Sequence, residues 1–131
     1  MSNVKAKRTS IKRQNLLDAA RELFFKYGVK RVTVEEICEK ARVSKMTFYK
    51  YFTDKMQLAL IVRDELLEQG FSKYEEINGM DISYPEKIDL ITQWRIDFFS
   101  KMTSEFIEEM LDIEDTIEKM KTLYLKNIAE A

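Results

Sequence analysis

The sequence predicts an all-α fold, in which a three-helix helix-turn-helix head is joined by a long fourth helix to a partial helical body. The 131 residues include only 3 Gly and 1 Pro, which favours long helices and few turns. Apolar side chains recur at helical spacing through most of the chain. Residues 1–55 hold 14 of the 22 Lys and Arg but only 6 of the 23 Asp and Glu, so their net charge is +8 and that of the remainder is −9.

This division of charge indicates a head that binds a polyanion and an acidic body. The plainer interpretation is a solvated surface with chance clustering, but the division falls where the helix-turn-helix pattern ends. We therefore predict two domains: 1–53, with a basic N-terminal arm, and 54–131, with the connecting helix and part of a ligand-binding and dimerisation domain.

Composition also excludes several classes of function. The chain has no histidine, which removes Ser-His-Asp and Cys-His catalysis and the usual zinc sites. Carboxylate and lysine chemistry are disfavoured but not removed, and we predict no enzyme, no catalytic residue, no cofactor and no metal. The single cysteine, Cys38, cannot form an intramolecular disulfide, and a buried small side chain is favoured over a redox sensor. No apolar run approaches 18 residues and no signal peptide is evident, so we expect a cytoplasmic protein without a membrane span.

The first element is a helix over about residues 11–27. Its apolar side chains share one face, and Gly28 follows as a candidate C-cap. Residues 1–13 are polar and basic, with little to bury. We expect an arm that is mobile without a polyanion and contacts phosphate when one is bound; a tail that only aids solubility is the alternative.

Two short helices around a tight turn follow over residues 33–52. Thr33 and Glu36 have the spacing of a capping box at the start of the first helix. Residues 41–43 form the turn, and Ser44 caps the second helix. That helix directs Phe48 and Phe52 inward and a cationic, hydroxyl-rich face outward, which suits the major groove of DNA.

Three segments, LLDAARELFFKYG, TVEEICEKARVS and KMTFYKYFTDK, occur in order and at characteristic spacing. Over about residues 11–60 the chain thus resembles the DNA-binding domain of TetR-family transcriptional repressors. It departs at Arg42, where the family commonly has Gly, and at Met46, where it often has Gly or Pro. We expect mild backbone strain at Arg42.

The resemblance implies which residues touch DNA. It assigns contacts with base edges to Lys45, Met46, Thr47 and Lys50. It assigns phosphate contacts to Thr33, Ser44, Tyr49, Tyr51 and Lys55. Packing in a half-buried position is the alternative for each tyrosine, and a plain helix-start carboxylate is favoured over base contact for Glu35.

The fourth helix is predicted over about residues 54–74. Asp54 and Gln57 can form a capping box at its start. Its first turns are apolar nearly all round, which is typical of a helix buried between two layers.

The body follows a break at residues 78–85. Ser83 and Pro85 start a fifth helix. A single last helix is predicted from about Ser104, because apolar residues from Phe106 to Tyr124 recur at alternating steps of four and three. An apolar ligand pocket and a plain core are both consistent with the lining set Trp94, Phe98, Phe99, Met102, Phe106 and Met110. The acidic side chains of this helix indicate a solvated face rather than a metal site.

The predicted function is a DNA-binding transcriptional regulator: a repressor that binds a two-fold related operator as a homodimer and is released by a small apolar effector. Release by an effector is implied by the resemblance. The alternative is a helical protein-interaction module whose helix-turn-helix is only structural. A carboxylate enzyme is a third interpretation, disfavoured because the carboxylates lie on an outer face.

Overall fold

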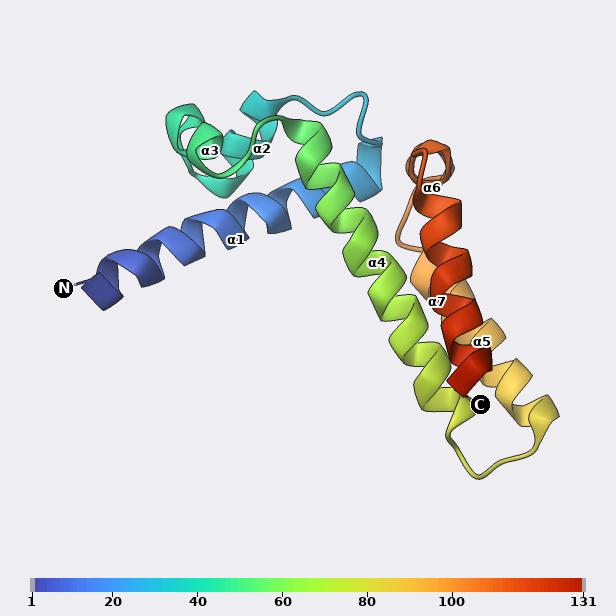
Figure 1. Cartoon of the computed structure of the whole chain (residues 1–131). Helices are drawn as coiled ribbons and strands as arrows, with labels where there is room; N and C mark the ends of the chain where they lie inside the picture. The colour runs from blue at the N-terminus through green and yellow to red at the C-terminus, as the bar shows by residue number, and fades with distance from the viewer. Residues whose placement is uncertain (1, 131) are drawn as a thin grey trace. The chain divides into compact units, whose positions relative to one another are not determined.

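The computed structural model describes residues 2–130, and over this range the chain forms helices and no strand (Figure 1). Side chains are described for residues 7, 8, 11–123 and 125. The helices are α1 (Ser2–Tyr27), α2 (Val34–Ala41), α3 (Lys45–Tyr51), α4 (Lys55–Asn78), α5 (Tyr84–Phe99), α6 (Ser104–Asp112) and α7 (Thr116–Glu130). The predicted all-α fold is thus confirmed. The chain divides into two compact units, Met1–Val62 and Arg63–Ala131.

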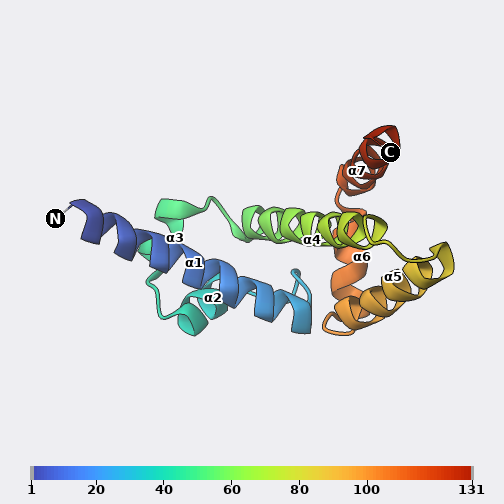
Figure 2. The same ribbon diagram turned by 90° about the horizontal axis from the view of Figure 1, so that it is seen from below.

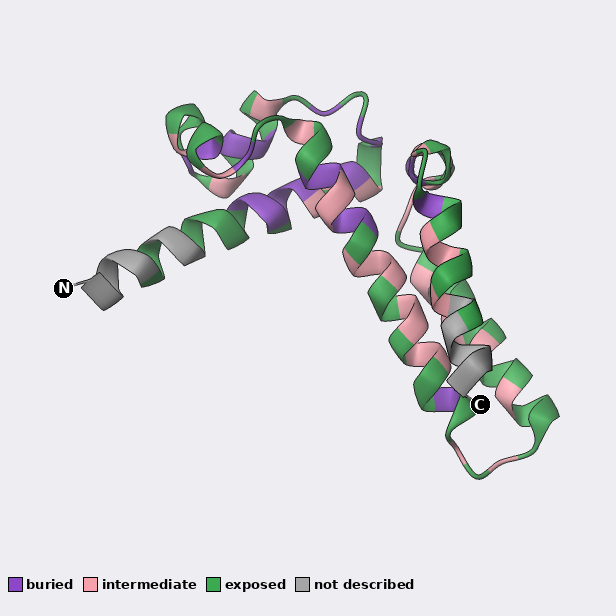
Figure 3. Cartoon of the chain, in the orientation of Figure 1, coloured by how far each residue is buried: buried purple, intermediate pink, exposed green. Residues whose placement is uncertain are grey.

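In the first unit, α1, α2 and α3 pack around a shared apolar core. Leu16, Ala20 and Phe24 of α1, Ile37 of α2 and Phe48 of α3 are all completely buried. Figure 3 shows this core as buried segments in the middle of α1 and along α2. Helix α1 begins at Ser2 rather than near Ile11. The predicted arm is therefore helical, and it escaped prediction because residues 2–10 have no apolar stripe.

Local hydrogen bonds cap the starts of α2 and α3, on either side of the turn. The Thr33 hydroxyl accepts from the Glu36 N–H at 3.1 Å, and the Glu36 carboxylate accepts from the Thr33 N–H at 3.3 Å, which confirms the capping box. The Ser44 hydroxyl accepts from the Thr47 N–H at 3.1 Å and caps α3. Between the helices, Arg42 is left-handed with φ 57° and ψ 43°, as expected for a position that favours glycine.

Helix α4 runs from the first unit into the second. The Asp54 carboxylate accepts from the Gln57 N–H at 2.9 Å and caps the helix. The Gln57 side chain accepts from the N–H of Thr53, at 2.7 Å, so the reciprocal bond of the capping box goes to the residue before the cap. Leu58, Ala59 and Val62 are completely buried and belong to the first unit.

The second unit contains the rest of α4 together with α5, α6 and α7. Ser83 caps α5, and its hydroxyl accepts from the Glu86 N–H at 3.3 Å. The prediction of one last helix was wrong: Ile113 is extended, and α6 and α7 are separate helices (Figure 2). The break is held by Arg63, which is 3% exposed and donates to the Asp115 carboxylate and, at 3.2 Å, to the buried Thr116 hydroxyl.

No helix in the described part of the chain combines the length and apolar character needed to cross a membrane.

Candidate nucleic-acid interface and ligand cavity

Helix α3 presents one exposed face and one buried face. Phe48 is completely buried, and its ring packs edge-on against Tyr49 at 5.1 Å and tilted against Phe52 at 5.6 Å. Met46 is 74% exposed and Tyr49 is 52% exposed. Because its inner face is anchored by aromatic rings, α3 presents its outer side chains from a rigid base.

The four predicted base-contacting residues lie on or beside the exposed face of α3. Lys45, Met46 and Lys50 are exposed, whereas Thr47 is half-buried and its hydroxyl accepts from the Ser44 hydroxyl at 2.9 Å. The Met46 side chain therefore lies mostly in solvent, as single apolar side chains on protein surfaces commonly do.

Lys45 forms an ion pair with Glu35 that the sequence did not predict. The two side chains are 54% and 62% exposed and join the first turns of α3 and α2. The Lys45 ammonium donates to the Glu35 carboxylate, which lowers the pKa of Glu35 and raises the pKa of Lys45. Both groups are therefore charged at neutral pH.

The predicted phosphate-contacting residues fall into two groups. Thr33 and Ser44 use their hydroxyls to cap α2 and α3, and both side chains remain exposed at helix N-termini. Tyr49 is exposed and Tyr51 is half-buried. The Tyr51 ring lies 6.3 Å from that of Phe52, so packing accounts for part of its surface.

Lys55 is engaged inside the first unit. Its ammonium donates to the carbonyl oxygens of Val29 at 2.9 Å, Lys30 at 3.1 Å and Val32 at 2.8 Å. An ammonium has three N–H donors, so all are used. The Lys55 ammonium therefore closes the loop after α1 and has no N–H left to donate to a phosphate.

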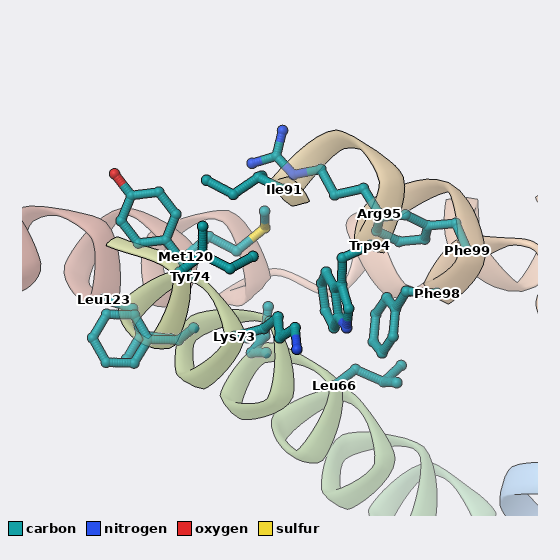
Figure 4. Close-up of a pocket in the computed structure, with 14 residues that line it drawn as sticks. Leu66, Lys73, Tyr74, Ile91, Trp94, Arg95, Phe98, Phe99, Met120 and Leu123 are labelled. Atoms are coloured by element: carbon teal, nitrogen blue, oxygen red, sulfur yellow. The ribbon is translucent and has the colours of Figure 1, made fainter. Parts of the chain in front are cut away.

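A small apolar cavity lies within the second unit, between α4, α5 and α7 (Figure 4). Its volume is about 100 Å³. Trp94 and Phe98 are stacked at 4.5 Å along one wall, and Figure 4 shows the Arg95 guanidinium extending toward Ile91. The lining residues are Leu66, Leu67, Gly70, Phe71, Lys73, Tyr74, Ile77, Ile91, Trp94, Arg95, Phe98, Phe99, Met120 and Leu123.

The cavity includes only half of the pocket set suggested by the sequence. Trp94, Phe98 and Phe99 line it. Met102, Phe106 and Met110 do not; Phe106 and Met110 are buried in the core of the second unit, and Met102 is half-buried after α5. The sequence analysis did not predict that α4 forms one wall of the cavity, although apolar residues such as Leu66, Leu67 and Phe71 recur along that helix.

The comparisons with known proteins agree in pointing to bacterial regulatory proteins with a helix-turn-helix. The family model described as "Bacterial regulatory proteins, tetR family" matches residues 16–62. The uncharacterized HTH-type transcriptional regulator YvdT of Bacillus subtilis (strain 168) is 29% identical over 126 residues, covering 90% of this chain and 62% of YvdT. The uncharacterized HTH-type transcriptional regulator YdeS of the same organism is 40% identical over 52 residues, covering 40% of this chain and 25% of YdeS. The chain thus spans less than two thirds of the length of either relative.

Two solved structures share the fold. A gamma-butyrolactone receptor (ArpA-like protein) matches with a TM-score of 0.60 and 26% identity, over 65% of this chain and 44% of that one. A transcriptional regulator (TerR/AcrR family) from Aquifex aeolicus VF5 matches with a TM-score of 0.61 and 22% identity, over 91% of this chain and 72% of that one. The family match and the helix-turn-helix geometry show that residues 16–62 are a domain of the tetR family of bacterial regulatory proteins, and the two solved structures show that the fold is shared.

Proposed function

We propose that this protein is a DNA-binding transcriptional regulator, and specifically a repressor that binds a two-fold related operator as a homodimer in the cytoplasm. The observation that supports this most is the outer face of α3. Lys45, Met46 and Lys50 stand exposed there above a completely buried Phe48. A helix of this kind places donors and an apolar tip at the base edges of the major groove.

The distribution of charge supports the same function. Residues 1–55 carry a net charge of +8, and Lys7, Arg8, Lys12 and Arg13 of α1 are exposed. Cations that replace the counterions of DNA supply most of the sequence-independent affinity. The acidic remainder of the chain would be repelled by the same phosphates, so only the first unit suits DNA.

The first experiment is selection of bound duplexes from a random pool at moderate salt. A two-fold related consensus is expected, with recognition helices about 34–36 Å apart, or further if the half-sites are separated. Recovery of a single half-site would support sequence-specific DNA binding but contradict binding as a homodimer. Absence of any consensus, with little affinity at any salt, would favour the alternative of a protein-interaction module with a structural helix-turn-helix.

The phosphate role of Tyr49 can be tested on the selected operator. Tyr49→Phe removes only the exposed hydroxyl and keeps the ring that packs on Phe48. It should weaken binding to all sequences alike, because a phosphate contact carries no base information. A changed base preference would show that Tyr49 reads a base instead.

Release by a small effector is the second part of the proposal, and the cavity supports it. Its walls are apolar and aromatic, and its charged lining residues, Lys73 and Arg95, are both cations although the second unit is acidic. A cavity of about 100 Å³ suits a compact, mainly apolar molecule, and an acidic group would complement the cations. Trp94 is the single tryptophan of the chain, so its fluorescence reports directly on this site.

Benzoate and its neutral isostere benzamide are suitable probes. We expect benzoate to quench Trp94 at lower concentration than benzamide and to weaken operator binding. Arg95→Gln should reduce the preference for benzoate, and Lys101→Gln, outside the cavity lining, should not. Equal quenching by both probes would contradict a preference of the cavity for an acidic ligand. Quenching without any effect on operator binding would contradict the role of the ligand as an effector.

Self-association is supported by the surface of α5. No described residue of this helix is buried, and Ile88, Ile96 and Phe99, which lie on one side of it, are between 44% and 60% exposed. Exposed apolar patches of this kind commonly mark protein contacts. Sedimentation should show a dimer that Ile96→Glu weakens, whereas a monomer at high micromolar concentration would contradict the proposal.

A further inference from the structure

The ion pair between Glu35 and Lys45 joins two helices at the end of the candidate interface. Glu35 lies in the first turn of α2, and Lys45 is the first residue of α3. The residues are ten positions apart, so the contact comes from the turn that brings the two helix N-termini together. In helix-turn-helix proteins, the N-terminal residues of the second helix contact base edges.

Folding alone does not explain this pair. Both side chains are more than half exposed, and exposed ion pairs contribute little to stability. Each helix is already capped, α2 by Thr33 and α3 by Ser44. A lysine at the first position of α3 is also opposed by the helix dipole, whereas Glu35 is favoured at the start of α2. The carboxylate therefore holds a cation at a place where the helix itself disfavours one.

We infer that Glu35 is a positioning residue for base recognition, which holds the Lys45 ammonium over a guanine and away from the neighbouring phosphates. The inference rests on the proposed DNA-binding function. A lysine ammonium on its flexible stem is otherwise free to pair with any nearby anion. In the pair with Glu35, one N–H donor is occupied and two remain, which matches the O6 and N7 acceptors of guanine.

The carboxylate also acts on the phosphates directly. Its negative charge repels the DNA backbone and cancels the positive charge of Lys45, so the pair adds nothing to sequence-independent attraction. Its effect is therefore a gain in discrimination with some loss of affinity. In contrast, the charge of an exposed lysine such as Lys7, Lys12 or Lys50 increases binding to every sequence.

The variant that tests this is Glu35→Gln, which keeps the size of the side chain and an acceptor oxygen but removes the charge. Affinity for random duplex DNA should rise, and the salt slope should steepen by about one, because Lys45 becomes free to bind a phosphate. Preference for guanine at one position per half-site should fall by about tenfold. Lys45→Met should lose the same preference without the steeper slope.

Glu39→Gln is the matched control. It removes the same charge from an exposed position of α2, and Glu39 forms no ion pair within the described part of the chain. It should alter affinity for all duplexes slightly and leave the preference at that position unchanged. The double variant Glu35→Gln with Lys45→Met should show no further loss of preference beyond Lys45→Met alone, since Glu35 acts through Lys45.

The experiment measures binding of each variant of the 131-residue chain to the selected operator, to operators substituted at each position, and to random duplex at several salt concentrations. If wild type discriminates and Glu35→Gln discriminates equally with an unchanged salt slope, the positioning role of Glu35 is overturned while DNA recognition stands. If wild type itself binds operator and random duplex alike, the proposed function fails, and the inference with it. Unchanged thermal unfolding of Glu35→Gln confirms that the comparison is between folded proteins.

Discussion

The two units of the chain bury their apolar residues to very different degrees. Among the described side chains, all but three of the buried apolar ones lie in Met1–Val62; the three in the second unit are Ile77, Phe106 and Met110. Helix α5 contributes no buried residue, although aromatic and aliphatic side chains recur along it. The units also carry opposite charge.

Under the proposed function, the two units use helices of the same kind in different ways. In the first unit, core rings such as Phe48 fix the exposed face of α3, so that recognition depends on a rigid support. In the second unit, half-buried residues such as Trp94 and Phe98 surround a cavity instead of filling it. Incomplete burial there leaves room for a ligand and an apolar surface for a partner.

The largest expected effect on stability comes from a substitution in the core of the first unit. Phe48→Ala should lower the free energy of unfolding by about 3–5 kcal/mol, because the ring is completely buried. Phe98→Ala should lower it by about 1–2 kcal/mol, since Phe98 is only half-buried and borders the cavity. Denaturant titration followed by circular dichroism measures both. Equal losses would contradict the contrast between the units.

A second prediction concerns Lys55. Lys55→Met keeps much of the apolar stem but removes an ammonium that donates to three carbonyls of the loop after α1. The free energy of unfolding should fall by about 2 kcal/mol, because the part-buried carbonyls lose charged donors. Lys50→Met, at an exposed position of α3, should change it by less than about 0.5 kcal/mol.

The same pair of variants separates stability from DNA contact. Lys50→Met should weaken operator binding and leave folding intact, whereas Lys55→Met should act mainly through folding. Should Lys55→Met leave stability unchanged and instead reduce the salt slope of DNA binding by about one, the phosphate contact implied by family resemblance would be restored.

Local features of the fold could be predicted from the sequence. The Thr33–Glu36 capping box, the Ser44 cap and the inward face of α3 each depend on residues within four positions of one another. The left-handed turn at Arg42 was predictable from the family resemblance, because the family commonly has glycine at this position.

Long-range polar contacts could not be predicted. The Lys55 ammonium reaches carbonyls 23 to 26 positions earlier, and Arg63 reaches Asp115 52 positions later. Sequence periodicity reports which face is buried, but it does not report which loop meets a given cation. For that reason the break between α6 and α7 was missed: the apolar steps continue through Ile113, while a buried arginine stabilises the interruption.

Arg42 provides a smaller test inside the well-packed unit. A left-handed conformation brings Cβ close to the following carbonyl, and glycine avoids this contact. Arg42→Gly should therefore raise the free energy of unfolding by about 1 kcal/mol. Arg42→Ala, which loses the charge but keeps Cβ, should change it little. Equal stability of the glycine and alanine variants would show that the backbone at residue 42 carries no strain.

The smallest expected effect lies in the second unit and depends on pH. The Arg63 guanidinium, by donating to the Asp115 carboxylate, lowers the pKa of Asp115 below its ordinary value of 3.8. A carboxyl whose pKa is lower in the folded state stabilises the fold above the unfolded value and loses this contribution as pH falls through the folded value. The stability difference between wild type and Asp115→Asn should thus be constant near neutral pH and shrink once pH falls below about 3.8.

Glu114→Gln, an exposed neighbour, serves as the control for general loss of charge. A difference that is the same at acidic and neutral pH would mean that packing around Arg63 and Thr116, and not the carboxylate charge, holds the break between α6 and α7.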